Sequence, residues 1–430
     1  MSTARSMPET QSTPDTIVTI EPSLAGIARE EWDACANPGW HLTPDGAVPA
    51  DGSVAAPEHA FNPFVAHDFL WSLEEAGAAT PRTGWAGAHL VARTPSGRLV
   101  GLVPCYAKTH SQGEYVFDQG WANAFERAGG SYYPKLQVSV PFTPATGRRL
   151  LVAPDAGGGE QARAMLIAGL QSLSRHTETS SVHATFLDAA DAEAFTTAGW
   201  LERNDQQFHW VNRGYRDFDD FLDAFASRKR KQVKRERREA VSAGIDIRQL
   251  TGRAITEADW DAFFAFYMDT GSRKWGRPYL NRRFFSLLGE RMAGSVVLIM
   301  AYRDGRAIAG ALNLVGSDTL YGRYWGAIEE HPFLHFEVCY HQAVEFALSR
   351  GLKRVEAGAQ GDHKLARGYE PVITRSAHFI TDPGLRTAVA RYLVHERAEV
   401  ASLNEALKDA TPYRRDRKDG DTDDACLGQD

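Results

Sequence analysis

The chain has 430 residues, of which 43% are hydrophobic, 24% charged and 10% aromatic, and its formal net charge is −7. This length predicts two domains rather than a single core, and the composition is that of a globular protein. The acidic balance excludes a protein that coats nucleic acid over its whole surface, although it is compatible with a local basic patch.

Targeting and redox features favour a cytoplasmic protein. No stretch reaches the roughly 18 to 20 apolar residues that span a bilayer. Residues 1–15 are polar and lack the apolar core of a secretory signal. The cysteines lie far apart and form no CxxC pair, so we expect neither a disulfide framework nor a bound metal. They are Cys35, Cys105, Cys339 and Cys426.

The ends of the chain are expected to lie outside the main fold. Residues 1–15 and 409–430 are polar and charged with few large aliphatic side chains, which predicts disorder. An N-terminal extension covers residues 16–61. It contains a loop rich in Gly, Pro, Ala and Asp between His41 and His59.

An internal duplication is the most informative feature of the sequence. Each half contains a strand, a tight turn with Ser-Gly or Asp-Gly, a second strand, a helix and a third strand. These elements are predicted at residues 88–93, 99–106, 160–176 and 182–187, and again at 295–302, 307–315, 336–350 and 354–357. Gly199-Trp200 and Gly368-Tyr369 then occupy equivalent positions. We therefore predict a first domain over residues 62–212 and a second over 215–394.

This order of elements resembles the GNAT acetyltransferase fold, and the tandem pair is similar to the Fem family of aminoacyl transferases that build peptidoglycan cross-bridges. Over residues 62–394 it resembles the FemAB-like branch of that superfamily. The resemblance implies an α/β fold with tandem GNAT-like (acyl-CoA N-acyltransferase) domains, mixed sheets flanked by helices and chemistry mainly in the second domain. The stretches that carry it are Pro81-Arg-Thr-Gly-Trp85, Gly113-Glu-Tyr-Val-Phe-Asp118, Tyr132-Tyr-Pro-Lys-Leu-Gln137, Pro141-Phe-Thr-Pro144, His335-Phe-Glu337 and Glu356-Ala-Gly-Ala-Gln-Gly-Asp-His-Lys364.

Residues 112–146 form an insertion in the first half that the second half lacks. Its many aromatic residues beside charges suggest a pocket wall between the lobes that binds substrate, with ordinary core packing as the competing interpretation. The candidate wall residues, including three outside the insertion, are Arg82, Trp85, Tyr115, Asp118, Tyr133, Lys135 and Trp275.

A basic helix is predicted over residues 217–242, with eight basic residues between Arg228 and Arg238. Such a run can be a solvated face in which Glu236 and Glu239 form pairs along the helix. Its density in an acidic protein also suggests a phosphate-bearing partner, and in Fem-like enzymes the donor is aminoacyl-tRNA. The candidate nucleic-acid-binding residues are Lys229, Arg230, Lys231, Lys234, Arg235 and Arg238.

The segment His335-Phe-Glu337, at the start of the predicted helix of the second half, is the first candidate catalytic site. A helix N-terminus offers free N–H groups and a positive dipole end, which favour a developing oxyanion. Glu337 or His335 could take a proton from an attacking amine, and Tyr340 could protonate the leaving group. Alternatively, Glu337 is a favoured first-turn carboxylate and Tyr340 a core aromatic residue.

The second candidate begins on the strand that ends near Glu356. Two glycines lead the chain away from this strand, so polar groups are expected at its carboxyl end, where sites in α/β sheets concentrate. Glu356 could be the base instead of Glu337, whereas a turn with solvated charges is the alternative. The candidate substrate-binding residues of this segment are Gln360, His363, Lys364 and Arg367.

Neither half contains the Gln/Arg-x-x-Gly-x-Gly/Ala loop with which coenzyme-A-dependent GNAT enzymes hold a pyrophosphate. Residues 156–160 are glycine-rich and open a helix, but a surface loop explains them as well. The second half has no glycine between Gly326 and Gly351. The sequence therefore predicts no bound cofactor, with acyl-coenzyme A as donor only in the alternative.

The leading hypothesis is transfer of an acyl or aminoacyl group, possibly from aminoacyl-tRNA, to an amine such as that of a cell-wall precursor. One alternative is an acyl-CoA-dependent N-acyltransferase. The other is a non-catalytic GNAT-like protein that binds RNA or a cell-wall precursor. The sequence leaves the acceptor, the base and the oligomeric state open.

Overall fold

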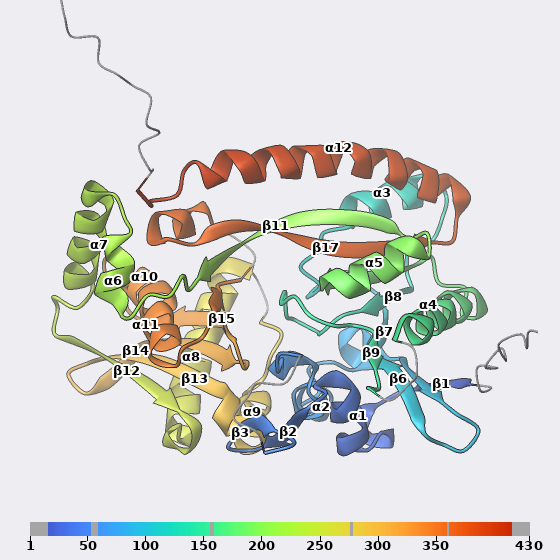
Figure 1. Cartoon of the computed structure of the whole chain (residues 1–430), viewed down its shortest axis with the longest axis horizontal. Helices are drawn as coiled ribbons and strands as arrows, with labels where there is room; N and C mark the ends of the chain where they lie inside the picture. Colours follow the sequence, from blue (N-terminus) through green and yellow to red (C-terminus); the bar gives the residue numbers. More distant parts are fainter. Residues whose placement is uncertain (1–15, 53–58, 155–158, 276–277, 359–360, 415–430) are drawn as a thin grey trace, which may run out of the picture.

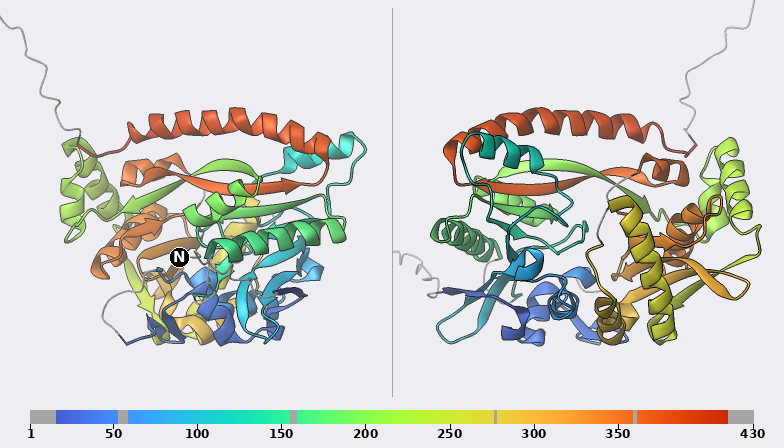
Figure 2. Two further views of the ribbon diagram at one scale, coloured as in Figure 1. Left: turned by 45° about the vertical axis from the view of Figure 1, so that its right-hand side comes forward. Right: turned by 180° about the vertical axis from the view of Figure 1, so that it is seen from behind.

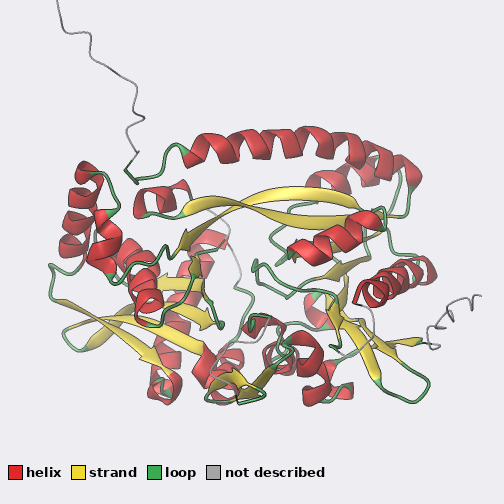
Figure 3. Cartoon of the chain, in the orientation of Figure 1, coloured by secondary structure: helices red, strands yellow, loops and turns green. Residues whose placement is uncertain are grey.

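The computed structural model describes residues 16–52, 59–154, 159–275, 278–358 and 361–414. Strands form a central layer and helices cover it on several sides (Figure 1; Figure 3). The expected disorder of residues 1–15 and 415–430 concerns segments outside the described residues. In the part of the chain that the structure describes, no helix is long and apolar enough to cross a membrane.

The second half builds an antiparallel sheet from β12 (Ile245–Thr251), β13 (Val296–Arg303), β14 (Arg306–Val315) and β15 (Thr319–Ala327). Asp304 and Gly305 both have positive φ values, 52° and 77°, as expected of a tight hairpin turn. The short strand β16 (Arg354–Glu356) lies parallel to β15. Within β15 it pairs with Thr319–Tyr321 alone, so these two strands separate beyond those residues.

Both faces of this sheet are covered, which explains why β13 is almost continuously apolar. Val296, Leu298 and Met300 pack against α8 (Glu257–Trp275) and α9 (Arg282–Met292). The alternate residues Val297 and Ile299 face the helices on the other side. Those helices are α6 (Phe218–Asp223), α7 (Ser227–Ala240), α10 (Leu334–Phe336) and α11 (Gln342–Ser349), and Figure 2 shows the arrangement from two more sides. This is the period-2 alternation of a fully buried strand.

The first half divides its strands between two sheets. Strand β1 (Ile17–Glu21) joins β5 (His89–Arg93), β6 (Leu99–Val103) and β9 (Leu151–Val152) in a small sheet. The predicted strand 99–106 is broken at Pro104, which cannot donate to a ladder. After it, β7 (Cys105–Lys108) enters the large sheet beside β4 (Trp85–Gly87) and β8 (Lys135–Val138).

The last strand of each half crosses to the other half. Strand β11 (Leu201–Val211) follows β10 (Ser181–Leu187) and α5 (Ala189–Thr197), yet it pairs with β16 and β17. Strand β17 (Glu370–Ile380) pairs with β10 of the first half. One sheet of eleven strands therefore continues across both halves, in the order β12-β13-β14-β15-β16-β11-β17-β10-β8-β7-β4. The boundary between the two predicted domains, at residues 212–215, stays a prediction from the sequence repeat.

Further helices surround the first half and the exchanged strands. Helix α4 (Gly159–His176) contacts β5, β6 and β10, and α12 (Pro383–Lys408) lies along β11 and β17 (Figure 1). Helix α3 (Gln119–Arg127) lies in the insertion, and α1 (Arg29–Ala36) in the N-terminal extension.

The chain stays packed beyond the point where the sequence predicts a disordered tail. Pro412 O accepts a hydrogen bond from Ala226 N at 2.9 Å, and the Tyr413 hydroxyl donates to Gly368 O at 2.6 Å. The expectation of disorder from residue 409 is therefore wrong for residues 409–414. The predicted basic helix also differs, because residues 224–226 separate α6 from α7.

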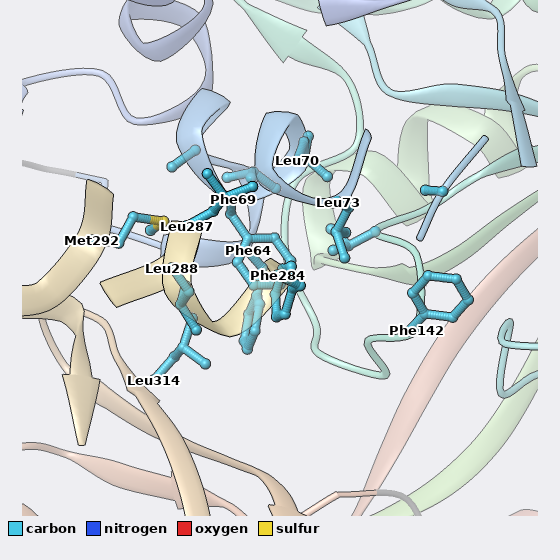
Figure 4. Close-up of a cluster of buried hydrophobic side chains, with 14 of the residues drawn as sticks. Phe64, Phe69, Leu70, Leu73, Phe142, Phe284, Leu287, Leu288, Met292 and Leu314 are labelled. Atoms are coloured by element: carbon cyan, nitrogen blue, oxygen red, sulfur yellow. The ribbon is translucent and has the colours of Figure 1, made fainter. Parts of the chain in front are cut away.

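A shared hydrophobic core joins the two halves. Phe64, Phe69 and Leu73, on or just before α2 (His67–Glu75), pack with Phe284 and Leu288 of α9 (Figure 4). The hairpin of β2 (Trp40–Thr43) and β3 (Gly46–Pro49) reaches the second half, where Gly294 N donates to Pro44 O at 2.7 Å. A Cβ on Gly294 would lie 2.0 Å from the Asp45 backbone, so this close contact requires glycine.

Candidate functional site

Glu337 lies in a π-helical turn (Glu337–His341) between α10 and α11, and its carboxylate faces the basic helix α7. Arg237 of α7 donates to it from Nε at 2.9 Å and from Nη2 at 2.7 Å, and Gln342 Nε2 donates at 2.9 Å. A second arm of Arg237 holds Glu345 at 2.8 Å. A carboxylate saturated by a bidentate arginine is a poor proton acceptor. The geometry therefore argues against Glu337 as the general base.

The other residues of the first candidate segment do meet the second one. Tyr340 Oη lies 2.8 Å from His363 Nε2, and the His335 ring is 5.4 Å from the Tyr340 ring and 6.0 Å from the His363 ring. Burial raises the pKa of Tyr340, so its phenol keeps its proton. The structure thus brings His335, Tyr340 and His363 together but leaves Glu337 on the α7 side.

The turn after β16 positions two further cations. Lys364 is buried, donates from Nζ to Gly358 O at 2.9 Å, and burial lowers its pKa to about 8. Arg367 stacks over the Phe336 ring at 3.5 Å and donates to Glu236 of α7 at 2.7 Å. Arg367 therefore connects this turn to α7 and already has a carboxylate partner. The predicted residue Gln360 lies outside the described residues.

Glu356, the last residue of β16, is the strongest candidate for a base. Its side chain is buried, and no described residue donates a hydrogen bond to Oε2. Burial raises the pKa of this carboxyl to about 7, although Arg354 and the backbone N–H of Thr146 act in the opposite direction. The paired residues Tyr321 and His209 flank it on β15 and β11. Its position is the point at which β15 and β16 separate.

His209 is held as a neutral imidazole beside Glu356. Gln207 donates from Nε2 to Pro144 O at 2.8 Å, so its Oε1 accepts a hydrogen bond from His209 Nε2 at 3.1 Å. This bond fixes the tautomer that carries hydrogen on Nε2. The same nitrogen lies 3.9 Å from Glu356 Oε2, and burial lowers the pKa of His209 to about 3.

A loop of the first half, residues 141–149, completes the surroundings of Glu356. Arg149 is fully buried and donates to three backbone carbonyls, those of Ala145, Arg148 and Thr185. It stiffens the loop that delivers Thr146 to Glu356. Phe142 O accepts hydrogen bonds from Arg323 at 2.5 Å and from the Tyr324 hydroxyl at 3.0 Å. Both halves therefore contribute to this region.

The expected aromatic wall of the insertion is instead a buried ionic network. Lys135 on β8 donates to Glu114 at 2.6 Å, to Ser111 at 2.8 Å and to Asp118. Tyr133 contacts the Ser111 hydroxyl at 2.8 Å. Core packing, which the sequence left as the alternative, describes Asp118 and Lys135 better than a pocket wall, because both are buried.

The remaining predicted wall residues are dispersed. Trp85 is buried beneath Lys108, whose Nζ lies 3.6 Å from the ring centroid, and Arg82 is exposed on a short 3-10 turn. Tyr115 is hydrogen-bonded to Arg323 at the interface of the halves. Trp275 ends α8, and its side chain lies outside the described residues. Among those wall residues whose side chains are described, Tyr115 alone approaches the region of Glu356 and Arg323.

Helix α7 presents a basic outer face. Arg230 pairs with Asp223 at 2.6 Å and Lys234 with Asp219 at 2.7 Å. The exposed cations of α7 without a described carboxylate within 4 Å are Arg228, Lys229, Lys231, Arg235 and Arg238. A surface hollow of about 450 Å³ adjoins the helix and includes Lys234 and Arg238 in its wall. The sequence predicts that Glu236 forms an ion pair within the helix, but its carboxylate pairs with Arg367 of another segment.

Sequence reasoning missed His209, Arg149 and Arg323. Each lies in a strand or loop whose local sequence carries no recognisable motif, so no spacing marked it. Across the described residues, no group of three or more His, Cys, Asp or Glu side chains is arranged to hold a metal ion.

The sequence profile of the FemAB-like family, described as peptidoglycan biosynthesis/recognition, matches residues 23–415. No curated protein matches the sequence. Among solved structures, FemX is 12% identical, with a TM-score of 0.51 over 85% of this chain and 98% of that chain. A tandem GNAT protein from the clavulanic acid biosynthesis pathway is 14% identical, with a TM-score of 0.44 over 86% of this chain and 99% of that chain. L-PGS from Bacillus licheniformis is 10% identical, with a TM-score of 0.46 over 79% and 99%. The likeness to FemX confirms the expected α/β fold of tandem GNAT-like units.

Proposed function

The chain belongs to the FemAB-like family of peptidoglycan biosynthesis and recognition proteins, and from that premise we propose that it joins an activated acyl or aminoacyl group to an amine with Glu356 as general base. Membership of this family makes it an acyl or aminoacyl transferase. The observation that carries the proposal is the buried Glu356 carboxyl, whose pKa is raised to about 7 at the point where β15 and β16 separate.

A general base works best when its pKa lies near the operating pH. In the proposed reaction the amine nitrogen attacks the carbonyl carbon of an activated ester, a C–N bond forms and the ester C–O bond breaks. Glu356 accepts the proton that the amine loses. The hydrogen-bonded Tyr340 and His363 supply a proton to the departing oxygen. The Lys364 ammonium offsets the negative charge that develops on the carbonyl.

The test compares Glu356→Gln with Glu337→Gln in an assay that detects new amides by mass spectrometry. Charged total tRNA and acyl-coenzyme A are offered as donors, and amine-bearing cell-wall precursors as acceptors. Glu356→Gln should lower kcat by about a hundredfold to ten-thousandfold, the range typical of a lost general base.

Glu337→Gln is the matched control, because it also removes one buried carboxylate charge, and it should retain turnover per folded molecule. The assignment of the base is overturned if Glu356→Gln keeps full kcat or if Glu337→Gln alone loses it. Circular dichroism at the assay temperature corrects both variants for unfolded protein.

The donor that the surface of α7 favours is aminoacyl-tRNA. Exposed cations are concentrated on this single helix, with Lys231, Arg235 and Arg238 on one face, which suits a polyanion. Arg367 links the helix directly to the turn that carries His363 and Lys364. The absence of the pyrophosphate-binding glycine pattern from the sequence supports the same donor.

If the donor is tRNA, binding should weaken steeply with salt. Neutralising four exposed cations of α7 should remove most of the affinity. It should also reduce the steepness of the plot of log K against log salt concentration by about 0.7 to 0.9 per lost phosphate contact. The variant changes Lys229, Lys231, Arg235 and Arg238 to Gln, and the matched control changes Arg98, Arg127, Arg306 and Lys353. Stoichiometric binding of acetyl-coenzyme A without tRNA affinity would establish the acyl-CoA alternative.

The acceptor in this proposal is the amine of a cell-wall precursor, which follows from the description of the family. A cytoplasmic location belongs to the same proposal. It is supported by the wide spacing of the cysteines in the sequence, which contains no CxxC pair.

A further inference from the structure

A small cavity lies where the two halves of the chain meet. About 10 Å³ of it is open to the centre of a water-sized sphere, which is room for one methyl-sized group. In Figure 4, Phe142 lies across from Phe284 and Leu73, which belong to its wall. The wall is apolar except for Thr143, Arg323 and Tyr324, and its other members are Phe64, Phe69, Leu73, Pro141, Phe142, Leu280, Phe284, Leu288, Leu312 and Leu314.

Arg323 reaches this cavity because of a β-bulge. Leu312 pairs with Tyr324 and Asn313 with Gly322, so Arg323 is an extra residue in β15. In a regular strand, neighbouring side chains point to opposite faces. Here Arg323 and Tyr324 both line the cavity and both donate to Phe142 O. Bulges commonly redirect a side chain beside an active site.

The positive charge of Arg323 forms no ion pair within 4 Å among the described residues, and at longer range it lowers the pKa of Glu356, against the larger effect of burial. The guanidinium is hydrogen-bonded to the Phe142 carbonyl and the Tyr115 hydroxyl. It also lies beside the rings of Phe64 and Tyr324, whose centroids are 5.7 Å and 5.2 Å from Cζ. Among the described residues, no Asp or Glu oxygen lies within 4 Å of the guanidinium, whereas Arg237 and Arg367 each pair with a glutamate. A half-buried guanidinium whose hydrogen bonds and ring contacts are all to neutral groups retains the capacity to bind an anion.

We propose that Arg323 and the apolar cavity form a binding site for a small carboxylate with a methyl-sized substituent. The guanidinium binds the carboxylate in a bidentate manner, and the substituent enters the cavity between Leu312 and Phe284. Assigning this carboxylate to the acceptor of the amide-forming reaction rests on the proposed function, because Tyr321, two residues before Arg323, pairs with Glu356. The binding itself requires no turnover.

Thermal unfolding of the full chain with added acetate, propionate or propionamide tests the site. Propionate should raise Tm in a saturable manner, with a Kd about fourfold lower than that of acetate because one more CH2 group is buried. Propionamide has the same shape without the charge and should produce no shift. Inorganic phosphate is a further probe for a site that recognises charge alone.

Arg323→Gln should abolish the propionate shift, and Arg323→Lys should weaken it because an ammonium cannot bind both oxygens in plane. Arg354→Gln is the matched control: it removes a positive charge beside Glu356 without touching the cavity, so binding should remain.

Unchanged propionate binding in Arg323→Gln, equal binding of propionamide, or phosphate binding that depends on Arg323 without any effect of carboxylate chain length would each overturn the proposal. Loss of turnover in Glu356→Gln without propionate binding would leave the proposed function intact and reject this site. Propionate binding together with a fully active Glu356→Gln variant would support this site and reject Glu356 as the base of the proposed function.

Discussion

At the scale of single residues, the hydrogen-bond donors separate two buried glutamates that sequence patterns present as equal candidates. Glu337 is buried with Arg237 and Gln342 as donors, so its charge is compensated. Glu356 is buried, and the nearest His209 nitrogen lies 3.9 Å from its Oε2. Because the few nearby donors and cations do not offset this burial, the pKa of Glu356 is raised. A raised pKa prepares a carboxyl group for proton transfer near neutral pH, and it also carries a cost in folding stability.

The cost at Glu356 depends on pH in a defined direction. The carboxyl has a pKa of about 7 in the folded chain, above the ordinary value of 4.5. Between these values the unfolded chain releases the proton and the folded chain retains it, so stability falls as pH rises and stays lower above pH 7. Relative to Glu356→Gln, the wild type should lose up to about 3 kcal/mol between pH 4.5 and pH 7.

Urea unfolding of both proteins at pH 5 and pH 7.5 measures this difference, and comparison with Glu356→Gln removes the contribution of other titrating groups. A difference in unfolding free energy that is the same at both pH values would show that Glu356 is already ionised in the folded chain at pH 5.

At the scale of elements, buried charges anchor the insertion to the large sheet. Lys135 lies on β8, while Glu114 and Asp118 lie in the segment before α3. Asp118 also accepts a hydrogen bond from Tyr132 at 2.7 Å, which continues to His183 on β10 at 3.2 Å. This network orders a long segment that has little regular secondary structure of its own.

Lys135→Met should destabilise the chain by about 3 to 5 kcal/mol, because two carboxylates would stay buried without their cation. Chemical denaturation measures the change, and Lys353→Met at an exposed position should alter stability by no more than about 0.5 kcal/mol. Adding Glu114→Gln and Asp118→Asn to Lys135→Met should recover part of the loss. No recovery in the triple variant would mean that packing of the lysine stem, rather than its charge, holds the insertion.

At the scale of the whole molecule, the exchanged strands make the two halves interdependent. Without the second half, β10 would lose β17, and β11 would lose both β16 and β17. The core in Figure 4 would be divided between α2 and α9. Unpaired strands and an exposed apolar face favour aggregation.

We therefore expect both halves to unfold in one transition. Hydrogen exchange followed by mass spectrometry in increasing urea should show that amides of β10 and β14 lose protection at the same urea concentration. A separate chain of residues 1–214 should be insoluble or unfolded. Protection that disappears from β10 well before β14, or a folded 1–214 chain, would show that the halves are independent domains.

The amino-acid sequence by itself determined the fold class and the order of elements. Strand alternation, Asp-Gly and Ser-Gly turns and helical periodicity are local, so they predict hairpins, helices and the repeat from residues close together in the chain. The same local pattern placed Glu356 and His363 on or just after a strand. Only the tertiary structure decided the rest, because it depends on residues far apart in sequence. Arg237 neutralises Glu337 across 100 positions, and Arg323 reaches the Phe142 carbonyl across 181. Burial of Glu356 requires strands and a loop from both halves, and no local pattern records which distant residues will exclude water from a carboxyl group.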